Sequence, residues 1–201
     1  MNTKEKILEQ ALLLFARRGY DAVSVGEIAQ AVGIKAPSLY KHYAGKRAIL
    51  DGIVQKMQAD YSSQAAMFHM DGDSPQADAP MFGALDEDGL VRSVLGLFTF
   101  FRQDPWNEAF RRMLTVEQFH SPELAQMYTE LYCDGPLGYQ SRLFQMLGAE
   151  EGETLALQFY GPVYLLLTLC DRQPERTEQA ERMLERHVRS FYRTMMGGKR
   201  E

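Results

Sequence analysis

The chain has few cysteines, no long apolar run and no overall excess of positive charge. Its two cysteines, Cys133 and Cys170, lie in no CxxC pair, so we expect neither a disulfide framework nor a zinc site. The longest apolar run, from Tyr160 to Cys170, is well short of the ~20 residues of a spanning helix and contains Pro162. The charged start MNTKEKILEQ has no following apolar segment typical of a signal peptide. We therefore expect a cytoplasmic protein without a membrane partner.

Motifs of common enzyme classes are also missing. The sequence has no GxSxG, HExxH, Walker loop or GxGxxG and no cluster of a nucleophile with a base, so we expect no enzyme, no catalytic residue and no cofactor. Glu117 and His120 have the spacing of half a di-iron site, but no second Glu-x-x-His completes it. His69, Asp71 and Asp73 lie at the edge of a predicted loop. We interpret both groups as solvated side chains and expect no metal.

Charge is distributed unevenly along the chain. The net charge is −5, which alone argues against a nucleic-acid partner. Residues 1–50, however, carry eight Lys or Arg and four Asp or Glu, whereas the remainder carries 14 basic and 23 acidic residues. A basic amino-terminal segment on an acidic body indicates a polyanionic partner at one end only.

Apolar residues recur at helical spacing, and no strand pattern persists. With 201 residues, 45% of them apolar, the chain can bury a large core, and we predict an all-α fold. The residues from Asp71 to Asp88 are rich in Gly, Pro and Asp and predict mainly a loop. Further helices are predicted over 89–102, 105–114, 122–147, 151–171 and 174–196. Gly135-Pro136 and Gly161-Pro162 should kink or break two of these helices.

The first 48 residues have the pattern of a helix-turn-helix domain. Ser24 and Glu27 form a capping box at the start of a second helix, and Gly33 ends it. Pro37 suits the first turn of a third helix that ends near residues 44–45, with Leu39 and Tyr43 facing the core. We predict a DNA-binding domain over 1–48, a connecting helix over about 46–70, and an effector-binding and dimerisation domain over 49–201.

The third predicted helix carries side chains suited to DNA. In a helix-turn-helix motif the amino-terminal residues of this helix reach base edges, and here these are Lys35, Ala36, Pro37 and Ser38. The outward Tyr40, Lys41 and His42 should face phosphates. Lys46 stands in the first turn of the following helix, where the helix dipole disfavours a cation. A docked phosphate would explain that position.

Residues 4–54 resemble the DNA-binding domain of the TetR family of bacterial transcriptional regulators. The segment ILEQALLLFARRGYDAVSVGEIAQAVGIKAPSLYKHYAGKRAIL follows the pattern of that family nearly throughout. The resemblance implies that Lys35, Ala36 and Ser38 face bases, with Pro37 on a thymine methyl. It implies that Tyr40, His42 and Lys46 hold phosphates. Many members have Thr where this chain has Val25, so no phosphate contact is assigned to Val25.

The resemblance also implies a function for the body. It would dimerise through the last two helices, and the dimer would bind a palindromic double-stranded DNA operator as a repressor, released by a small, mostly apolar effector. The middle of the chain is rich in aromatic residues and methionine, which suits an apolar pocket. The candidate effector-binding residues are Phe101, Trp106, Phe110, Met113, Tyr132, Tyr160 and Tyr164. An alternative is a DNA-binding regulator whose body docks a protein, and a more remote one is a helical enzyme.

Overall fold

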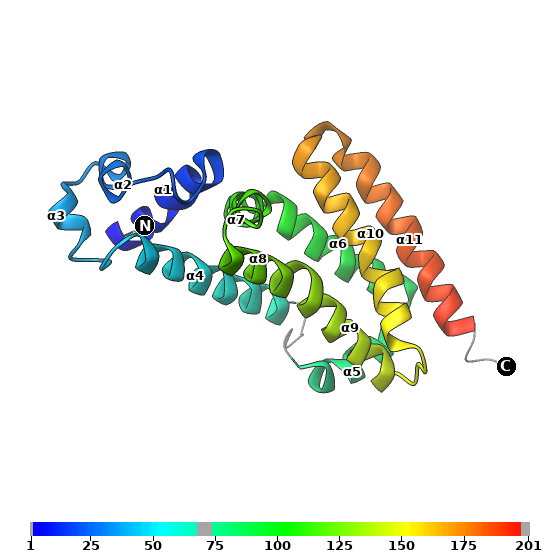
Figure 1. Ribbon diagram of the computed structural model, residues 1–201. Coiled ribbons are helices and arrows are strands. Elements are labelled where there is room, and N and C mark those ends of the chain that lie inside the picture. The colour runs from blue at the N-terminus through cyan, green and yellow to red at the C-terminus, as the bar shows by residue number, and fades with distance from the viewer. Residues whose placement is uncertain (1, 68–73, 198–201) are drawn as a thin grey trace. The chain divides into compact units, whose positions relative to one another are not determined.

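The computed structural model describes residues 2–67 and 74–197, which form helices and turns and contain no strand (Figure 1). The all-α fold class is thereby confirmed. The helices are α1 (Thr3–Arg18), α2 (Val25–Val32), α3 (Ala36–Leu39), α4 (Lys46–Met67), α5 (Pro75–Ala84), α6 (Glu87–Gln103), α7 (Pro105–Glu117), α8 (Pro122–Thr129), the π-helix η1 (Glu130–Asp134), α9 (Gly135–Met146), α10 (Gly152–Arg172), the 3₁₀ helix η2 (Pro174–Arg176) and α11 (Thr177–Gly197). No helix among the described residues is both long and apolar enough to span a membrane.

The helices form two compact units. Unit 1 combines Met1–Tyr61 with Asp104–Tyr128, and unit 2 combines Ser62–Gln103 with Thr129–Glu201. Helix α7 therefore packs on α1 of the helix-turn-helix segment, although it lies far from it in the sequence, and α8 belongs to the same unit. The functional boundary between residues 48 and 49 stays a prediction.

Unit 1 is built around side chains that its helices bury together. Ile7, Phe15, Ile28, Leu39 and Ile49 come from α1, α2, α3 and α4 and are fully buried or nearly so. Helix α1 packs against both α2 and α7. The core thus holds all three helices of the predicted DNA-binding domain, and α7 covers α1 from outside that domain.

The helix ends of unit 1 follow local capping chemistry. Asn2 and Glu5 form a capping box at the start of α1, and Ser24 and Glu27 form the predicted one at the start of α2. Gly33 ends α2 with φ of 79°, a left-handed conformation that favours glycine. These short-range bonds fix where the chain turns, and hence how α3 is presented.

Unit 2 is a helical bundle in which α10 packs on α9, α11 and α6. Three aromatic rings, those of Phe144, Phe159 and Phe191, meet in its core with centroids 5.0 to 5.7 Å apart. Arg189 of α11 bonds to Glu87 (3.1 Å) and Asp88 (2.7 Å) at the start of α6. The hydrogen bond from Arg193 and that from Arg189 both lower the pKa of Glu87. Apolar packing and this ion-pair network together hold α11 against α6.

The segment 75–84 was predicted as loop and is helix α5 instead. Ser74 caps it by accepting the Ala77 N–H (3.3 Å), and Pro75 fits the first helical position. The buried Asp78 accepts a hydrogen bond from the Tyr139 hydroxyl of α9 (2.5 Å). Tertiary contact therefore overrides a composition that favours a loop. His69, Asp71 and Asp73 lie outside the described residues.

The two Gly-Pro pairs act differently from one another. Helix α10 continues through Gly161-Pro162, so no break occurs there, although Pro162 has no N–H to donate to the Gln158 carbonyl. At Gly135-Pro136 the predicted helix over 122–147 is interrupted by the π-helix η1. The Gly135 N–H donates to the Glu130 carbonyl, and a Cβ at position 135 would collide with that oxygen. Glycine is therefore required where the π turn returns to α-helix.

A substitution at Gly152 tests the close approach of α9 and α10. A Cβ at this position would lie 2.5 Å from the Ser141 carbonyl oxygen. Gly152→Ala should lower the free energy of unfolding by about 1–3 kcal/mol, measured by urea denaturation. Gly138→Ala is the matched control, because a Cβ there meets only the Arg142 guanidinium at 3.8 Å. The control should be neutral or stabilising by about 0.5–1 kcal/mol, and equal effects would contradict the assignment.

Candidate nucleic-acid interface

Helix α3 and the turns after it present the predicted DNA-reading residues. Leu39 is 0% and Tyr43 8% exposed, which confirms that these two side chains anchor the segment in unit 1. The side chains predicted to meet DNA lie on the other side. Lys35, Pro37, Tyr40, Lys41 and His42 are exposed, and Ala36 and Ser38 are partly exposed.

The third helix is shorter than predicted. It covers only Ala36–Leu39 and does not reach residues 44–45. Beyond it two bonds follow the 3₁₀ pattern, since Lys41 N–H donates to the Ser38 carbonyl (3.3 Å) and His42 N–H to the Leu39 carbonyl (2.8 Å). The Tyr43 N–H then donates to the Leu39 carbonyl (3.1 Å) in the α pattern. The tighter turns still carry the chain to the buried Tyr43, so the predicted division into two faces holds.

The chemistry of the exposed face suits a nucleic acid. Tyr40 is 55% exposed, so its ring and hydroxyl are accessible to a partner. Its hydroxyl can donate to a phosphate, as can the neighbouring Lys41 and His42. Lys35 and Ser38 offer hydrogen bonds to base edges, and Pro37 offers an apolar contact.

The amino terminus of α2 is fixed by the capping box and by α1. Ser24 Oγ accepts the Glu27 N–H (3.2 Å), and Glu27 accepts the Ser24 N–H (2.8 Å). Arg18 pairs with the same carboxylate at 2.6 Å. The hydrogen bond from the Ser24 backbone, followed by that from Arg18, lowers the pKa of Glu27 to about 2. The carboxylate therefore stays ionised and holds the turn over a wide pH range.

Lys46 has partners within its own chain. Its ammonium donates to the Tyr20 carbonyl (2.8 Å) and the Asp21 carbonyl (3.3 Å), and it lies 4.4 Å from the centroid of the Tyr20 ring. From the sequence alone, a docked phosphate would explain its unfavourable position in the first turn of α4. The structure gives a different reason, because the lysine closes the turn between α1 and α2. Phosphate binding by Lys46 stays a prediction.

Glu117 was interpreted as a solvated side chain, and this is wrong. It is 4% exposed and accepts the Tyr20 backbone N–H at 2.9 Å. Sequence spacing relates it to His120 but cannot reveal a partner in the turn after α1. Among the described ranges, 2–67 and 74–197, no three His, Cys, Asp or Glu side chains gather so as to hold a metal ion.

The seven candidate effector-binding residues fall in both units. Trp106, Phe110 and Met113 lie on α7 in unit 1, where the last two are buried. In unit 2, the Tyr160 hydroxyl donates to the Tyr132 carbonyl (3.0 Å), and the Tyr160 and Tyr164 rings are 6.3 Å apart. Those three tyrosines are thus brought together. The fourth residue of unit 2 is Phe101, which packs against the bundle core.

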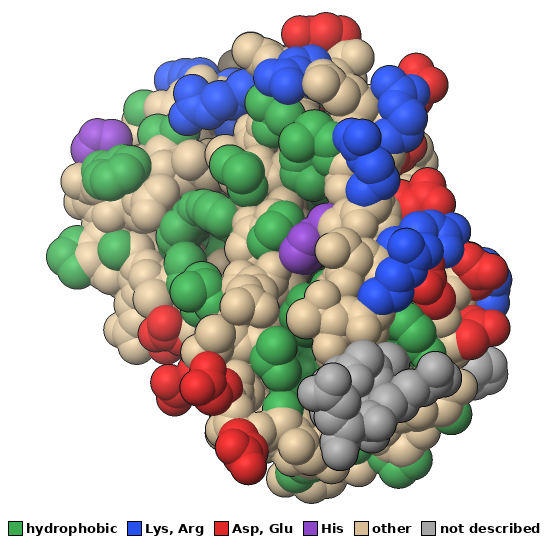
Figure 2. Space-filling view, turned by 90° about the vertical axis from the view of Figure 1, so that its right-hand side faces the viewer, with side chains coloured by type: hydrophobic (Ala, Val, Ile, Leu, Met, Phe, Trp, Pro, Cys, Tyr) green, Lys and Arg blue, Asp and Glu red, His purple; other side chains and the backbone are tan. Residues whose placement is uncertain are grey.

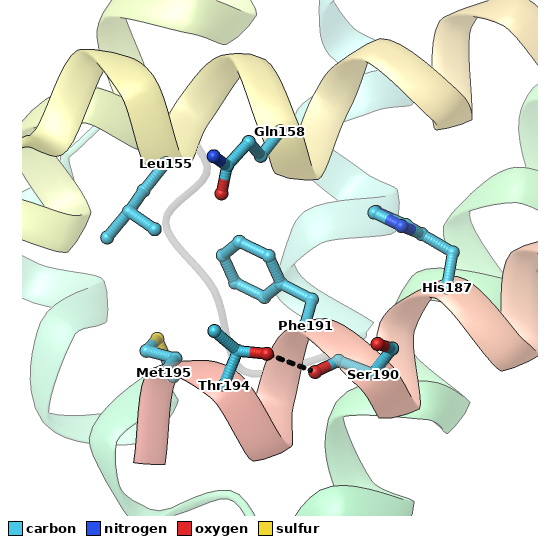
Figure 3. Close-up of a pocket in the computed structure, with 7 residues that line it drawn as sticks. All are labelled: Leu155, Gln158, His187, Ser190, Phe191, Thr194 and Met195. Carbon is cyan, nitrogen blue, oxygen red and sulfur yellow. Dashed lines mark hydrogen bonds between the residues drawn. The ribbon is translucent and has the colours of Figure 1, made fainter. Parts of the chain in front are cut away.

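A groove of about 290 Å³ lies between α10 and α11 and was not predicted (Figure 3). It is lined by Leu155, Gln158, His187, Ser190, Phe191, Thr194 and Met195, none of them a candidate effector-binding residue. Figure 3 shows Leu155 and Gln158 extending from α10 towards the Phe191 ring of α11. The spacing of His187, Ser190 and Thr194 places them on one face of α11. This spacing is the only indication of a polar groove wall that could be read from the sequence.

Residues 7–53 match the family model for bacterial regulatory proteins of the tetR family. IcaR of Staphylococcus aureus (strain Newman), a negative transcriptional regulator of a biofilm operon, is 36% identical over 76 residues, which are 38% of this chain and 40% of IcaR. The transcriptional repressor ComR of Escherichia coli (strain K12) is 34% identical over 65 residues, 30% of this chain and 31% of ComR. The matched region is thus less than half of either relative. The similarity to the tetR family therefore covers the amino-terminal segment for which the sequence predicts it.

Solved structures extend the similarity of fold over nearly the whole chain. The complex of SmeT with triclosan has a TM-score of 0.64 and 18% identity, with 98% of this chain and 91% of SmeT covered. A TetR-family regulator from Mesorhizobium loti has a TM-score of 0.59 and 20% identity, covering 97% of this chain and 95% of its own. At these identities the similarity establishes the fold of the body, not its ligand.

Acid should weaken the α2 cap, and Glu27→Gln should remove part of that sensitivity. The folded-state pKa of Glu27 is lowered from 4.5 to about 2, so its stabilising contribution is complete above pH 4.5 and is lost as pH falls towards 2. Thermal unfolding followed by circular dichroism should show a smaller drop in Tm over this range for the variant. Glu9→Gln, which removes a carboxylate from α1 instead, controls for the change in net charge. Parallel pH profiles for the wild type and Glu27→Gln would contradict the assignment.

Proposed function

We propose that this protein is a DNA-binding transcriptional regulator that binds a palindromic operator as a dimer and is released by a small effector. The exposed α3 face carries this proposal, because Leu39 and Tyr43 anchor it in a segment that is similar to the tetR family. Repression, rather than activation, is supported by the two relatives, which are a negative regulator and a repressor.

In the proposed complex, α3 enters the major groove. Lys35, Ala36, Pro37 and Ser38 would read bases, because they stand at the start of the recognition helix. Tyr40, Lys41, His42 and Lys46 would hold phosphates on either side. Lys46 uses two of its three donors within the chain, so a phosphate would bind its remaining N–H or replace a carbonyl partner.

The proposed dimer forms through the outer faces of α10 and α11. Leu157, Leu165 and Met183 are 62%, 65% and 39% exposed. Burial of these apolar side chains against a second copy would remove their surface from water. Figure 2 shows apolar side chains spread over this side of the molecule, with charged ones mainly towards its edges. On the opposite face of α11, Ala180, Leu184 and Val188 are fully buried within the chain. The two faces of α11 therefore serve the core and the proposed partner separately.

The groove between α10 and α11 adds shape to that surface. On α10, Leu165 is seven residues, about two turns, after the groove residue Gln158 and therefore lies on the same face. On α11, Met183 is one turn before the groove residue His187 and likewise shares its face. The His187 Nε2 atom lies 3.3 Å from the Phe159 carbonyl, so it carries the hydrogen in this arrangement and ties the two helices together. A side chain from a second copy would fill this groove.

The proposed effector is small and mostly apolar. Support comes from the aromatic candidates on α7 and in the Tyr132, Tyr160 and Tyr164 cluster, since aromatic walls with a few hydroxyls are typical of such pockets. SmeT, which shares the fold, has been solved with the small molecule triclosan. The effector itself is not identified by either observation.

DNA recognition is tested with a duplex selected from a random library by the full-length protein. Lys35→Ala should lower affinity for that duplex by about 1–3 kcal/mol and lower affinity for a scrambled duplex much less. Lys41→Ala should weaken both duplexes alike and reduce the slope of log K against log salt by about 1, because it contacts phosphate. Fluorescence anisotropy at several salt concentrations measures both.

Arg142→Ala, an exposed arginine of unit 2, is the matched control and should bind like the wild type. Failure to enrich any duplex would refute the proposed function. An equal loss on both duplexes for Lys35→Ala would place Lys35 on phosphate instead of a base.

The dimer is tested by Leu165→Asp, since an aspartate at a site 65% exposed should not disturb the fold of the free chain. It would bury an unpaired charge in the proposed interface, and sedimentation at micromolar concentration should shift from dimer to monomer. Phe119→Asp, at an 80% exposed position of unit 1, should leave the dimer intact. A wild-type monomer, or a dimeric Leu165→Asp variant, would rule out this interface.

A further inference from the structure

The turn between α1 and α2 is held by side chains from three helices. Glu117 of α7 accepts the Tyr20 N–H (2.9 Å), and Lys46 of α4 donates to the Tyr20 carbonyl (2.8 Å). Arg18 of α1 donates to the Ala22 carbonyl (3.1 Å). The Tyr20 ring packs edge-on against Phe15, with centroids 5.1 Å apart. Both backbone polar groups of Tyr20 are therefore bonded to charged side chains.

The contact between Glu117 and this turn is close and buried. Glu117 is 4% exposed, and its Oε1 atom would lie 2.7 Å from a Cβ at position 19. Gly19 also has φ of 85°, a conformation that side chains disfavour. Glycine thus lets α7 bring its carboxylate against the backbone.

The hydrogen bond between the Tyr20 amide and the Glu117 carboxylate is a strong one. A hydrogen bond from a backbone amide to a carboxylate is about twice as strong as one between neutral groups. An amide in a partly buried site that loses its acceptor is left without the bond that compensates its desolvation. The turn would therefore shift to find water if Glu117 lost its oxygen, and its other bonds would shift with it.

One group that the proposed function assigns to DNA lies next to this turn, because Lys46 is bonded to the Tyr20 carbonyl directly. Ser24, the cap of α2, follows Tyr20 by four residues. A displaced Tyr20 would change the position of the Lys46 ammonium at the start of α4. It would also change the entry of the chain into α2, against which α3 packs.

We propose that Glu117 is a positioning residue for DNA binding: its buried carboxylate, bonded to the Tyr20 amide, sets the α1–α2 turn and with it Lys46 and the start of α2. Glu117 itself does not touch DNA. The inference rests on the proposed function, and it adds a residue outside the matched segment 7–53 to the determinants of affinity.

The test compares Glu117→Gln and Glu117→Met in the full-length chain. Glutamine keeps an oxygen for the Tyr20 N–H but not the charge, whereas methionine keeps the approximate volume and offers no good acceptor. Glu108→Met is the matched control, because Glu108 is an exposed carboxylate of the same helix that pairs with Arg112 (2.9 Å). Binding to the duplex selected by the wild type is measured at a temperature where urea titration shows every variant folded.

The affinity should fall in a defined order. Glu117→Met should bind at least about tenfold more weakly, and Glu117→Gln about threefold, since the neutral bond retains roughly half the strength. Hydrogen exchange at the Tyr20 amide should accelerate in the same order while exchange in α10 and α11 is unchanged. Glu108→Met should match the wild type in both readouts.

Several results would overturn the proposal. These are wild-type affinity in Glu117→Met despite faster Tyr20 exchange, or a loss in Glu117→Gln as large as in Glu117→Met. If Glu117→Met does not fold, Glu117→Gln decides alone, and unchanged affinity and exchange in that variant would refute the role. Failure of the wild type to select any duplex would instead refute the proposed function, so the two failures are distinguishable.

Discussion

Helix α3 has four residues, and burial of Leu39 keeps it in place. A single helical turn is not stable by itself in water, because nucleation costs more than one or two hydrogen bonds return. Leu39 and Tyr43 anchor the segment from both sides of the exposed Tyr40, Lys41 and His42. The exposed groups of this segment, which are proposed to meet DNA, are therefore oriented by apolar packing. The core around Ile7, Phe15 and Ile28 would serve the proposed binding as well as stability.

Features that depend on neighbouring residues could be predicted from the sequence. The capping box of Ser24 and Glu27, the end of α2 at Gly33 and the start of α4 at Lys46 all formed as expected. Each depends on residues within one turn of each other, so spacing is enough to find them. The burial of Leu39 and Tyr43 follows equally from their four-residue separation. Once the core positions Leu39 and Tyr43 are assigned, helical spacing leaves the remaining residues of the segment on the exposed face.

Features that depend on distant residues could not be predicted. Glu117 and Tyr20 are 97 positions apart, and neither position carries a local signal of their bond. Lys46 shows the same limit. The sequence reveals its unfavourable position in the first turn of a helix, but not that its ammonium bonds to the Tyr20 and Asp21 carbonyls. Helix α5 forms in a loop-like composition because α9 supplies the Tyr139 hydroxyl to Asp78. In each case the deciding partner comes from another helix.

The composition of unit 1 bears on how segments could be exchanged between this chain and its relatives. The segment that matches the family ends at residue 53, yet the compact unit includes Asp104–Tyr128, whose α7 packs along α1 and supplies Glu117. A chimera that joins only the first 53 residues to another body would leave the face of α1 beneath α7 uncovered. A segment exchange that keeps unit 1 intact would therefore move both of its segments together. The crossover points belong near residues 61, 104 and 128, where the chain passes between its two units.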